Sequence, residues 1–246
     1  MTHAALHWLL LLGGSFNPPH IGHLRIAIEG REALRPEKTL LIPAASPPHK
    51  PDARLLPFEM RVEMLKKRLA SLPPEWRLDT CEVENEREGP SYTIDTLEIL
   101  FRRYPGNRLA FLMGAEDYSQ LSSWYRWHEI PTYADIVVIP RKEHASESFH
   151  RNTLVFWPEA LTLPEPRLPR SYAAQAVPPP LCSHIRYAYV LPGGGKCLYL
   201  PLALLEISSS LVRQRFLSAL SLDFLVPPAV LAMLQENTEK IRNAWD

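Results

Sequence analysis

A run of four leucines that stops at two glycines constrains this chain more than any other feature. Residues 8–12 (WLLLL) are apolar without interruption and end at Gly13 and Gly14, which is typical of a short central strand covered on both faces. From His20 onward the apolar residues recur at helical spacing through Ile28. This stretch therefore predicts a strand, a glycine-rich turn and an amphipathic helix, in that order.

The turn between this strand and this helix has the chemistry of an anion site. The helix begins near residues 19–22, where backbone N–H groups and the helix dipole attract phosphate. The two preceding glycines lack the Cβ atoms that would keep a ligand away from the backbone. His20 and His23 are three residues apart, so both imidazoles lie on one face and can reach the same anion. We favour a phosphate site over the alternative, two incidental histidines in an ordinary strand–turn–helix.

The rest of the chain repeats the alternation of strands and helices. We expect further strands at 39–42, 76–83, 109–113, 134–139 and 197–200, and helices at 58–70, at 93–104, after Ser208 and near residue 246. This order predicts an α/β fold with a doubly wound, mostly parallel sheet. We expect one domain over residues 1–246, with a proline-rich insertion at about 144–195 in which 154–157 and 185–191 are candidate strands.

Three shorter segments have simple structural interpretations. His49 and Lys50 lie in a proline-rich loop, where they are expected to be solvated charges at a loop tip. Ser91 or Thr93 is expected to cap the helix over 93–104. The inward face of that helix is expected to carry Ile94, Leu97, Phe101 and Tyr104. The four glutamates at 82, 84, 86 and 88 are expected to form an exposed acidic loop rather than a metal site.

The segments GGSFNPPHIGH (13–23) and ISSSLVR (207–213) together resemble the two signatures of one protein superfamily. H-x-G-H and I-S-x-S-x-x-R are typical of nucleotidylyltransferases, and more narrowly the chain resembles the bacterial nicotinate-mononucleotide adenylyltransferases. The letters His-Ile-Gly-His alone also spell the first signature of the class I aminoacyl-tRNA synthetases. That alternative is weaker, because the sequence has no lysine-rich K-M-S-K-S loop and no room for a tRNA-binding domain.

The resemblance implies a Rossmann-like nucleotidylyltransferase fold and assigns roles to matching residues. It implies catalytic roles for His20, His23 and Arg213. It implies that ATP is bound by Gly13, Gly14, Ser15, Phe16, His20, Gly22, His23, Gly114, Glu116, Asp117, Ile207, Ser208, Ser210 and Arg213. It implies that the second substrate is bound by Asn17, His49, Lys50, Ser91, Tyr92, Thr93, Trp124 and Tyr125. Glu116 stands where the family has aspartate, and Asp117 follows it, so either carboxylate could contact the ribose.

The implied reaction transfers the adenylyl group of ATP to nicotinate mononucleotide, giving deamido-NAD and pyrophosphate in NAD biosynthesis. Mg²⁺ is the implied cofactor, because it bridges phosphate oxygens. The alternative acceptors are nicotinamide mononucleotide and other phosphorylated compounds such as phosphopantetheine. A nucleotide-binding regulator without catalysis is a different class of function. The presence of His20, His23 and Arg213 argues against it.

Composition limits the partners and the compartment. Lys and Arg total 27, as do Asp and Glu, which argues against a broad nucleic-acid surface. Cys81, Cys182 and Cys197 are far apart without a C-x-x-C pattern, as expected for a reducing cytoplasm. No apolar run has transmembrane length, and residues 1–12 lack the basic region and cleavage site of a signal peptide. The sequence leaves a homo-oligomer open.

Overall fold

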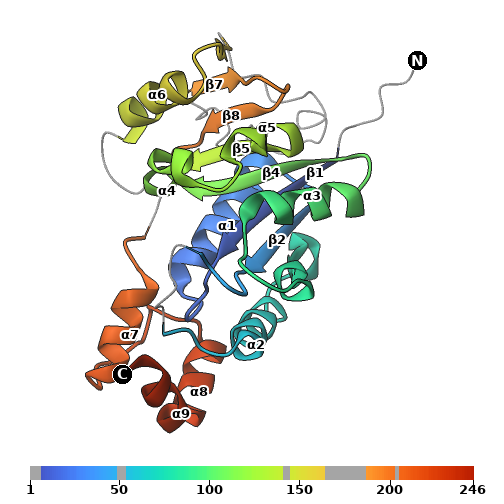
Figure 1. Ribbon diagram of the computed structural model, residues 1–246. Helices are drawn as coiled ribbons and strands as arrows, with labels where there is room; N and C mark the ends of the chain where they lie inside the picture. Colours follow the sequence, from blue (N-terminus) through green and yellow to red (C-terminus); the bar gives the residue numbers. More distant parts are fainter. Residues whose placement is uncertain (1–6, 49–53, 141–144, 164–186, 203–204) are drawn as a thin grey trace. The chain divides into compact units, whose positions relative to one another are not determined.

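The computed structural model describes residues 7–48, 54–140, 145–163, 187–202 and 205–246 (Figure 1). Its strands are β1 (His7–Gly14), β2 (Lys38–Pro43), β3 (Leu78–Thr80), β4 (Asn107–Gly114), β5 (Ala134–Ile139), β6 (Leu161–Thr162), β7 (Tyr187–Val190) and β8 (Lys196–Tyr199). They form one sheet in the order β3-β2-β1-β4-β5-β8-β7-β6. The pairs β1–β4, β4–β5 and β5–β8 are parallel, whereas β7 is antiparallel to both β8 and β6. The predicted mostly parallel sheet is confirmed.

Helices lie between most of these strands and after the last one. The α-helices are α1 (Ile21–Leu34), α2 (Phe58–Leu69), α3 (Thr93–Arg103), α4 (Ala115–Ser119), α5 (Ile130–Tyr133), α6 (Ala145–Phe156), α7 (Ser209–Leu217), α8 (Pro228–Glu236) and α9 (Thr238–Trp245). Short 3₁₀ helices are η1 (Pro74–Trp76), η2 (Val83–Glu86), η3 (Leu121–Ser123) and η4 (Trp127–Glu129). Within the described residues, none of the helices has the length and apolar character needed to span a bilayer.

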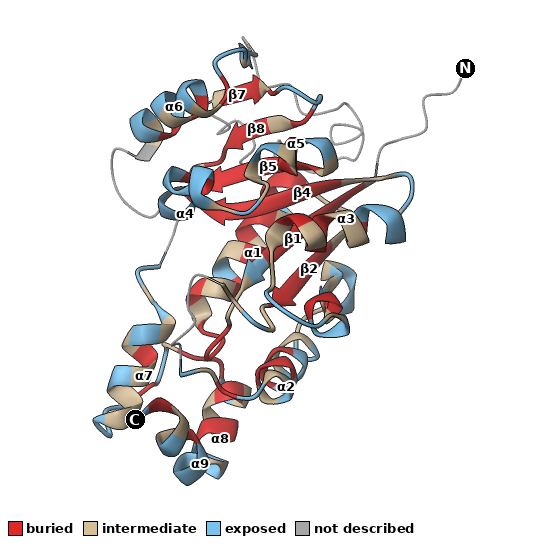
Figure 2. Ribbon diagram, viewed as in Figure 1, coloured by how far each residue is buried: buried red, intermediate tan, exposed pale blue. Residues whose placement is uncertain are grey.

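The leucine run forms the buried strand that its pattern predicts. Residues 9–12 of β1 are all at most 6% exposed, and neighbouring residues of a strand point to opposite faces, so both faces of β1 are covered (Figure 2). The register pairs Leu9 with Leu109 and Leu12 with Leu112. The carboxyl ends of these parallel strands therefore lie at the same edge of the sheet. The glycine-rich turn begins at that edge, directly after Leu12.

The chain divides into two compact units. One contains the described residues of Met1–Leu12, Glu29–Thr39 and Tyr92–Ala203, and the other those of Gly13–Ile28, Leu40–Ser91 and Leu204–Asp246. The first unit holds most of the central sheet. In the second, buried side chains of α2, α7, α8 and α9 form one apolar core, which includes Met64, Val212, Val230 and Trp245. The division of the sequence into one domain with an insertion stays a prediction.

The strand predicted over 76–83 is wrong in extent. β3 covers three residues, Leu78–Thr80, and 3₁₀ helices precede and follow it. Arg77 has a positive φ of 49°, which breaks the extended backbone before β3. The acidic segment is also not wholly exposed, because Glu84 is buried. Glutamates at every second position of the sequence do not show which of them a 3₁₀ helix will bury.

The region expected as an insertion contains both helix and strand. Residues 154–156 belong to α6, so the strand predicted at 154–157 is wrong, whereas β7 confirms a strand within 185–191. Leu154 and Val155 are exposed, while Phe149 of the same helix is buried and its ring lies 5.1 Å from that of Tyr199. Helical packing through Phe149 therefore overrides the strand preference of the apolar run. Residues 164–186 lie outside the described part.

The start of α3 is capped differently from the prediction. The N-cap residue is Tyr92, with no side-chain cap hydrogen bond, so neither Ser91 nor Thr93 is the cap. The Ser91 hydroxyl instead accepts a hydrogen bond from the Ser46 backbone N–H at 3.0 Å. Further along α3, Ile94, Leu97 and Leu100 are buried, but Phe101 is 47% exposed. The predicted inward face is therefore correct at its start and wrong at Phe101.

Candidate functional site

The two histidines of the first signature stack on each other at the start of α1. Their ring centroids lie 3.7 Å apart with an interplanar angle of 26°, and His20 is buried. The ring of Phe16 packs 4.7 Å from that of His23. Phe16 is fully buried and has a positive φ of 46°, so the glycine-rich turn folds sharply beneath the imidazoles.

Backbone hydrogen bonds select one tautomer for each imidazole. Nδ1 of His23 accepts a hydrogen bond from the N–H of His20 at 3.3 Å, and Nδ1 of His20 accepts one from the N–H of His23 at 3.4 Å. An accepting ring nitrogen carries no proton, so the proton of each neutral ring is on Nε2. In this tautomer the Nε2–H of each ring is a hydrogen-bond donor, the kind of group from which a phosphate oxygen accepts.

The glycine of H-x-G-H is required by close packing. A Cβ on Gly22 would lie 3.0 Å from ring atoms of His20 and 3.2 Å from the backbone oxygen of Ile207. Only a residue without a side chain fits this approach without displacing its neighbours. The two signatures therefore meet here within one unit, although almost the whole sequence separates them.

Arg213 and Ser209 of the second signature donate hydrogen bonds to the backbone of the glycine-rich turn. Arg213 donates from Nη1 to the backbone oxygen of Asn17 at 2.9 Å and from Nη2 to the Ser210 hydroxyl at 3.1 Å. The Ser209 hydroxyl donates to the backbone oxygen of Pro18 at 3.0 Å. Burial lowers the pKa of Arg213, but an arginine keeps its charge at neutral pH. Its charge therefore lies beside the turn that holds the histidines.

Ser208 has the structural role that a serine at a helix start predicts. Its side chain accepts a hydrogen bond from the Leu211 N–H at 3.1 Å and caps α7. A cap of this kind is worth about 1 kcal/mol. The cap orients the first turn of α7, where Ser210 and the backbone N–H groups lie.

The side chain of Asn17, a residue predicted to bind substrate, is buried and hydrogen-bonds other parts of the protein. It is 1% exposed. Its Oδ1 accepts from the Leu56 N–H at 2.9 Å and from Trp245 Nε1 at 3.4 Å, and its Nδ2 donates to the Arg54 backbone oxygen at 2.8 Å. These bonds fix the turn to two distant parts of its unit. A substrate contact by Asn17 stays a prediction.

Arg61 supports the same turn, although it belongs to neither of the two sequence signatures. It is 1% exposed on α2, donates from Nη1 to the Ser15 backbone oxygen at 2.6 Å and from Nε to the Leu56 backbone oxygen at 3.0 Å. Burial lowers its pKa. Its helical spacing to Met64 and Leu65 on the buried face was the available signal. An arginine on an apolar face is buried only when hydrogen bonds satisfy it.

A second group of predicted residues lies in the other unit. The rings of Tyr92 and Tyr125 are 4.5 Å apart, and Trp124 packs edge to face on Phe111 at 6.3 Å. Trp124 is partly buried and Tyr125 is 52% exposed. Thr93 is the first residue of α3. Aromatic rings therefore lie beside a helix start in this unit. A flat anionic ligand can stack on such rings, and the free N–H groups of a helix start can bind its charge.

Three residues predicted to bind ATP, Gly114, Glu116 and Asp117, lie at the start of α4. Gly114 is the N-cap of α4, and Glu116 and Asp117 are both exposed in its first turn. The choice between the two carboxylates stays open. The ring of Trp127 packs on those of Phe156 and Trp157 at 5.6 and 5.4 Å, so Trp127 is part of an aromatic core. Two residues predicted to bind the second substrate, His49 and Lys50, lie outside the described part of the chain.

The chain is similar in sequence to proteins of one known family. Residues 11–215 match the model of the cytidylyltransferase-like family. A protein of Trichlorobacter lovleyi, named a probable nicotinate-nucleotide adenylyltransferase, is 35% identical over 226 residues, which cover 92% of this chain and 95% of the relative. This chain belongs to the nicotinate-nucleotide adenylyltransferases of the cytidylyltransferase-like family. A relative of the same name from Geobacter metallireducens is 33% identical and covers 92% of this chain and 94% of its own length.

A solved structure of a family member has the same fold. The nicotinic acid mononucleotide adenylyltransferase of Plasmodium falciparum, solved in complex with NaAD, matches with a TM-score of 0.65 at 15% sequence identity. The match covers 95% of this chain and 97% of that one. The likeness is one of fold. Membership of the family, which the two signatures imply, is confirmed by the family model and by the relatives at 35% and 33% identity.

Proposed function

We propose that this protein transfers the adenylyl group of ATP to the 5′-phosphate of nicotinate mononucleotide. The products are nicotinate adenine dinucleotide (deamido-NAD) and pyrophosphate, an activity of NAD biosynthesis. The observation that carries the proposal is the set of hydrogen bonds from Arg213 and Ser209 to the turn beneath His20 and His23. They join a cation, hydroxyls and two imidazole donors into one anion-binding group, which matches a triphosphate.

The reaction needs alignment and charge stabilisation rather than a covalent enzyme intermediate. A phosphate oxygen of nicotinate mononucleotide attacks the α-phosphorus of ATP. The bond from that phosphorus to the oxygen bridging to the β-phosphate breaks, and pyrophosphate leaves with those electrons. We assign the Nε2–H groups of His20 and His23 to the ATP phosphates, with His23 on the α-phosphoryl oxygens where charge develops. We assign Arg213, together with Lys50, to the β and γ phosphates, because a cation there stabilises the leaving group.

We propose that Mg²⁺ accompanies ATP. When bound, Mg²⁺ would offset part of the negative charge of the triphosphate. Within the described ranges, no group of three or more His, Cys, Asp or Glu side chains is placed to hold a metal ion. In this proposal the ion is carried to the site by the triphosphate and keeps several waters.

The acid form of the pyridine nucleotide suits the second group of residues. The first N–H groups of an α-helix have no partner within the helix and favour an anion. α3 begins at Thr93 directly after Tyr92, so a nicotinate carboxylate at this helix start would be stabilised, whereas a neutral amide would gain less. We therefore assign Tyr92 and Thr93 to the carboxylate end and Trp124 to the pyridine ring.

Pyrophosphate release tests the proposal and its acceptor together. Purified protein is incubated with MgATP and, separately, nicotinate mononucleotide, nicotinamide mononucleotide or phosphopantetheine. We expect release with the acid nucleotide, with kcat/KM about fivefold above that for the amide, since one charge interaction at a helix start is worth ~1 kcal/mol. Release with phosphopantetheine alone, or with none of the three, contradicts the proposal.

Trp124→Ala is expected to weaken the pyridine nucleotide selectively. Loss of an aromatic stack should raise KM for nicotinate mononucleotide about tenfold, from ~1.4 kcal/mol of lost stacking. The KM for ATP should change less than about twofold, because Trp124 is assigned no contact with it. Trp127→Phe, in the aromatic core, is the matched control. An unchanged KM for nicotinate mononucleotide in Trp124→Ala removes this residue from the site.

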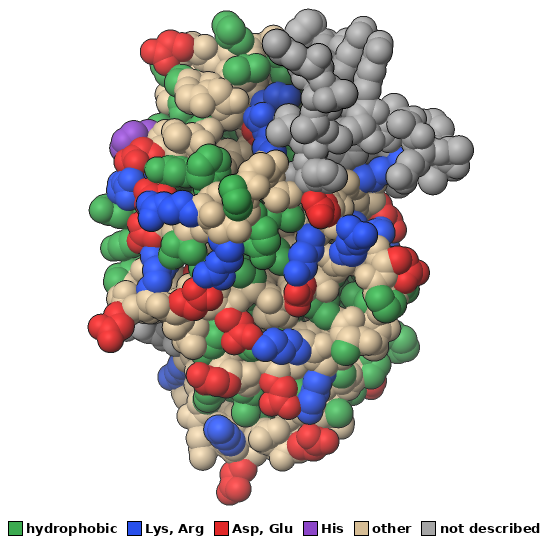
Figure 3. Space-filling view, turned by 90° about the vertical axis from the view of Figure 1, so that its right-hand side faces the viewer, with side chains coloured by type: hydrophobic (Ala, Val, Ile, Leu, Met, Phe, Trp, Pro, Cys, Tyr) green, Lys and Arg blue, Asp and Glu red, His purple; other side chains and the backbone are tan. Residues whose placement is uncertain are grey.

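We also infer a cytoplasmic protein that acts on small molecules. Cys81 and Cys197 are buried free thiols, which suits a reducing compartment. On the face shown in Figure 3, acidic and basic side chains are interspersed rather than gathered by sign. This supports nucleotide substrates over a nucleic-acid surface.

A further inference from the structure

Arg126 stands at a constrained position between two residues of the proposed pyridine group and the aromatic core. It follows Trp124 and Tyr125, and it precedes Trp127. Its backbone is left-handed, with φ 49° and ψ 35°. A non-glycine residue adopts this conformation only at an energetic cost. The surrounding contacts of Arg126 must therefore compensate for that cost.

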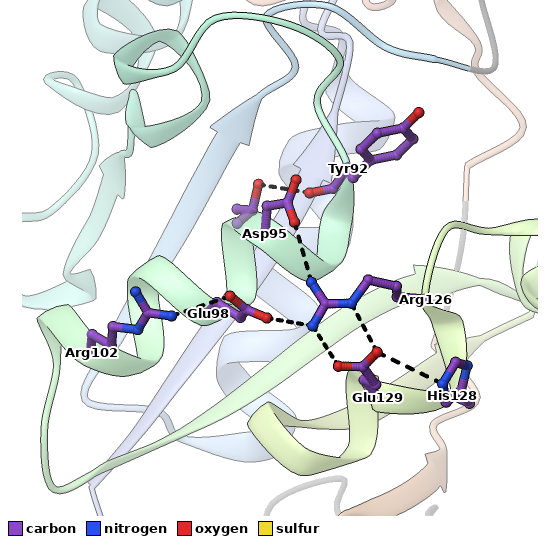
Figure 4. Close-up of polar contacts among 8 residues, drawn as sticks. Tyr92, Asp95, Glu98, Arg102, Arg126, His128 and Glu129 are labelled. Carbon is purple, nitrogen blue, oxygen red and sulfur yellow. Dashed lines mark hydrogen bonds and ion pairs between the residues drawn. The ribbon is translucent and has the colours of Figure 1, made fainter.

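The guanidinium of Arg126 is surrounded by three carboxylates (Figure 4). It donates from Nε and Nη2 to the two carboxylate oxygens of Glu129, at 2.8 and 2.5 Å. It also donates from Nη2 to Oε1 of Glu98 at 2.8 Å, and its Nη1 lies 3.8 Å from Oδ1 of Asp95. The pair with Glu129 is bidentate, the geometry in which arginine pairs most strongly and with fixed orientation.

These contacts link the Trp124–Glu129 segment to α3. Glu98 and Asp95 are on α3, which begins one residue after Tyr92, whereas Glu129 is in the same short segment as Arg126. The Tyr92 and Tyr125 rings touch at the same place, with centroids 4.5 Å apart. One arginine therefore fixes the segment that carries Trp124 and Tyr125 against the helix whose start carries Tyr92 and Thr93.

The network is more sheltered than a surface ion pair. The side chains of Arg126 and Glu98 are 32% and 18% exposed, whereas Arg102, which contacts the same Glu98 at 3.3 Å, is 74% exposed. Hydrogen bonds from Arg126 lower the pKa of Glu129 below its ordinary value, so this carboxylate is charged at neutral pH. Partly shielded, multiply bonded charges hold geometry better than isolated exposed pairs do.

We infer that Arg126 is a positioning residue for the pyridine nucleotide: it holds Trp124 and Tyr125 in place relative to the start of α3. The inference rests on the proposed function. Arg126 itself touches no substrate in this scheme. Its removal should therefore affect the binding of one substrate through the placement of other side chains, and leave the ATP group unchanged.

The test compares Arg126→Asn with Arg102→Ala. Asparagine tolerates the left-handed backbone, so this variant removes the guanidinium while keeping the local fold. We expect KM for nicotinate mononucleotide to rise about tenfold, with KM for ATP within about twofold of wild type. Calorimetric titration with nicotinate mononucleotide should show the same weakening. Arg102→Ala removes the exposed partner of Glu98 and should leave both constants unchanged.

A cycle with Glu98→Gln separates positioning from general stability. If Arg126 acts through Glu98, the double variant should raise KM for nicotinate mononucleotide by less than the product of the single effects. A uniform loss in both substrates, or a wild-type KM for nicotinate mononucleotide in folded Arg126→Asn, overturns the inference. Should Arg126→Asn not fold, a wild-type KM in Glu98→Gln overturns it instead. Absence of pyrophosphate release by the wild-type protein contradicts the proposed function and not the role of Arg126.

Discussion

Replacing His23 by alanine lowers kcat about a hundredfold or more, equivalent to ~3 kcal/mol of lost transition-state stabilisation. The variant loses the Nε2–H donor that we assign to the α-phosphoryl oxygens, where charge increases as the bond to pyrophosphate breaks. It also removes the ring that stacks on His20 at 3.7 Å. Steady-state pyrophosphate release at saturating MgATP and nicotinate mononucleotide measures the effect, with circular dichroism to show that the variant is folded.

His23→Gln is the matched variant for this prediction. The glutamine amide places an N–H donor near the position of Nε2, so part of the turnover should return relative to His23→Ala. Near wild-type kcat in His23→Ala would show that the ring does not stabilise the transition state. Equal losses in the two variants would mean that the ring's shape, rather than its donor, is what the reaction needs.

Replacing Arg61 by methionine lowers the free energy of unfolding by about 2–4 kcal/mol. Methionine retains much of the volume, but the backbone oxygens of Ser15 and Leu56 lose their partner, and each buried polar group left unpaired costs ~1–3 kcal/mol. Urea unfolding followed by tryptophan fluorescence measures the change in midpoint. Because Ser15 belongs to the glycine-rich turn, KM for ATP should rise as well.

Lys67→Met on the same helix is the control for Arg61→Met. Lys67 is about half exposed and pairs with Glu63 one turn earlier, a surface contact worth less than ~0.5 kcal/mol. It should therefore unfold within about 0.5 kcal/mol of wild type. If Arg61→Met unfolds at the same midpoint as this control, Arg61 does not support the turn.

Local patterns predicted the parts of the fold that local forces decide. The leucine run at 9–12 and the strand at 134–139 were located correctly, because a short apolar run between turn residues is typical of a central strand covered on both faces. The helix at 58–70 was correct for the same kind of reason. The run at 154–157 was assigned wrongly, because packing of Phe149 on Tyr199 decided its structure, and that contact joins residues distant in sequence.

The residues of the candidate site could be predicted from the sequence, but the contacts between them could not. Spacing alone put His20 and His23 on one face, and the signatures named Arg213. The contact of Arg213 with the backbone of Asn17 joins residues 196 positions apart, and that of Trp245 with the Asn17 side chain spans 228. Such pairings depend on the packing of α7 and α9, which no local pattern encodes. For the same reason nothing in the sequence indicates that the Asn17 side chain hydrogen-bonds other parts of the protein.

The most direct measurement is the identity of the product. Purified protein is incubated with MgATP and nicotinate mononucleotide, and the mixture is separated by anion exchange and analysed by mass spectrometry. We predict nicotinate adenine dinucleotide and pyrophosphate in equal amounts, both reduced together in His23→Ala. Hydrolysis of ATP without any dinucleotide, or a dinucleotide formed only from another acceptor, would contradict the central claim.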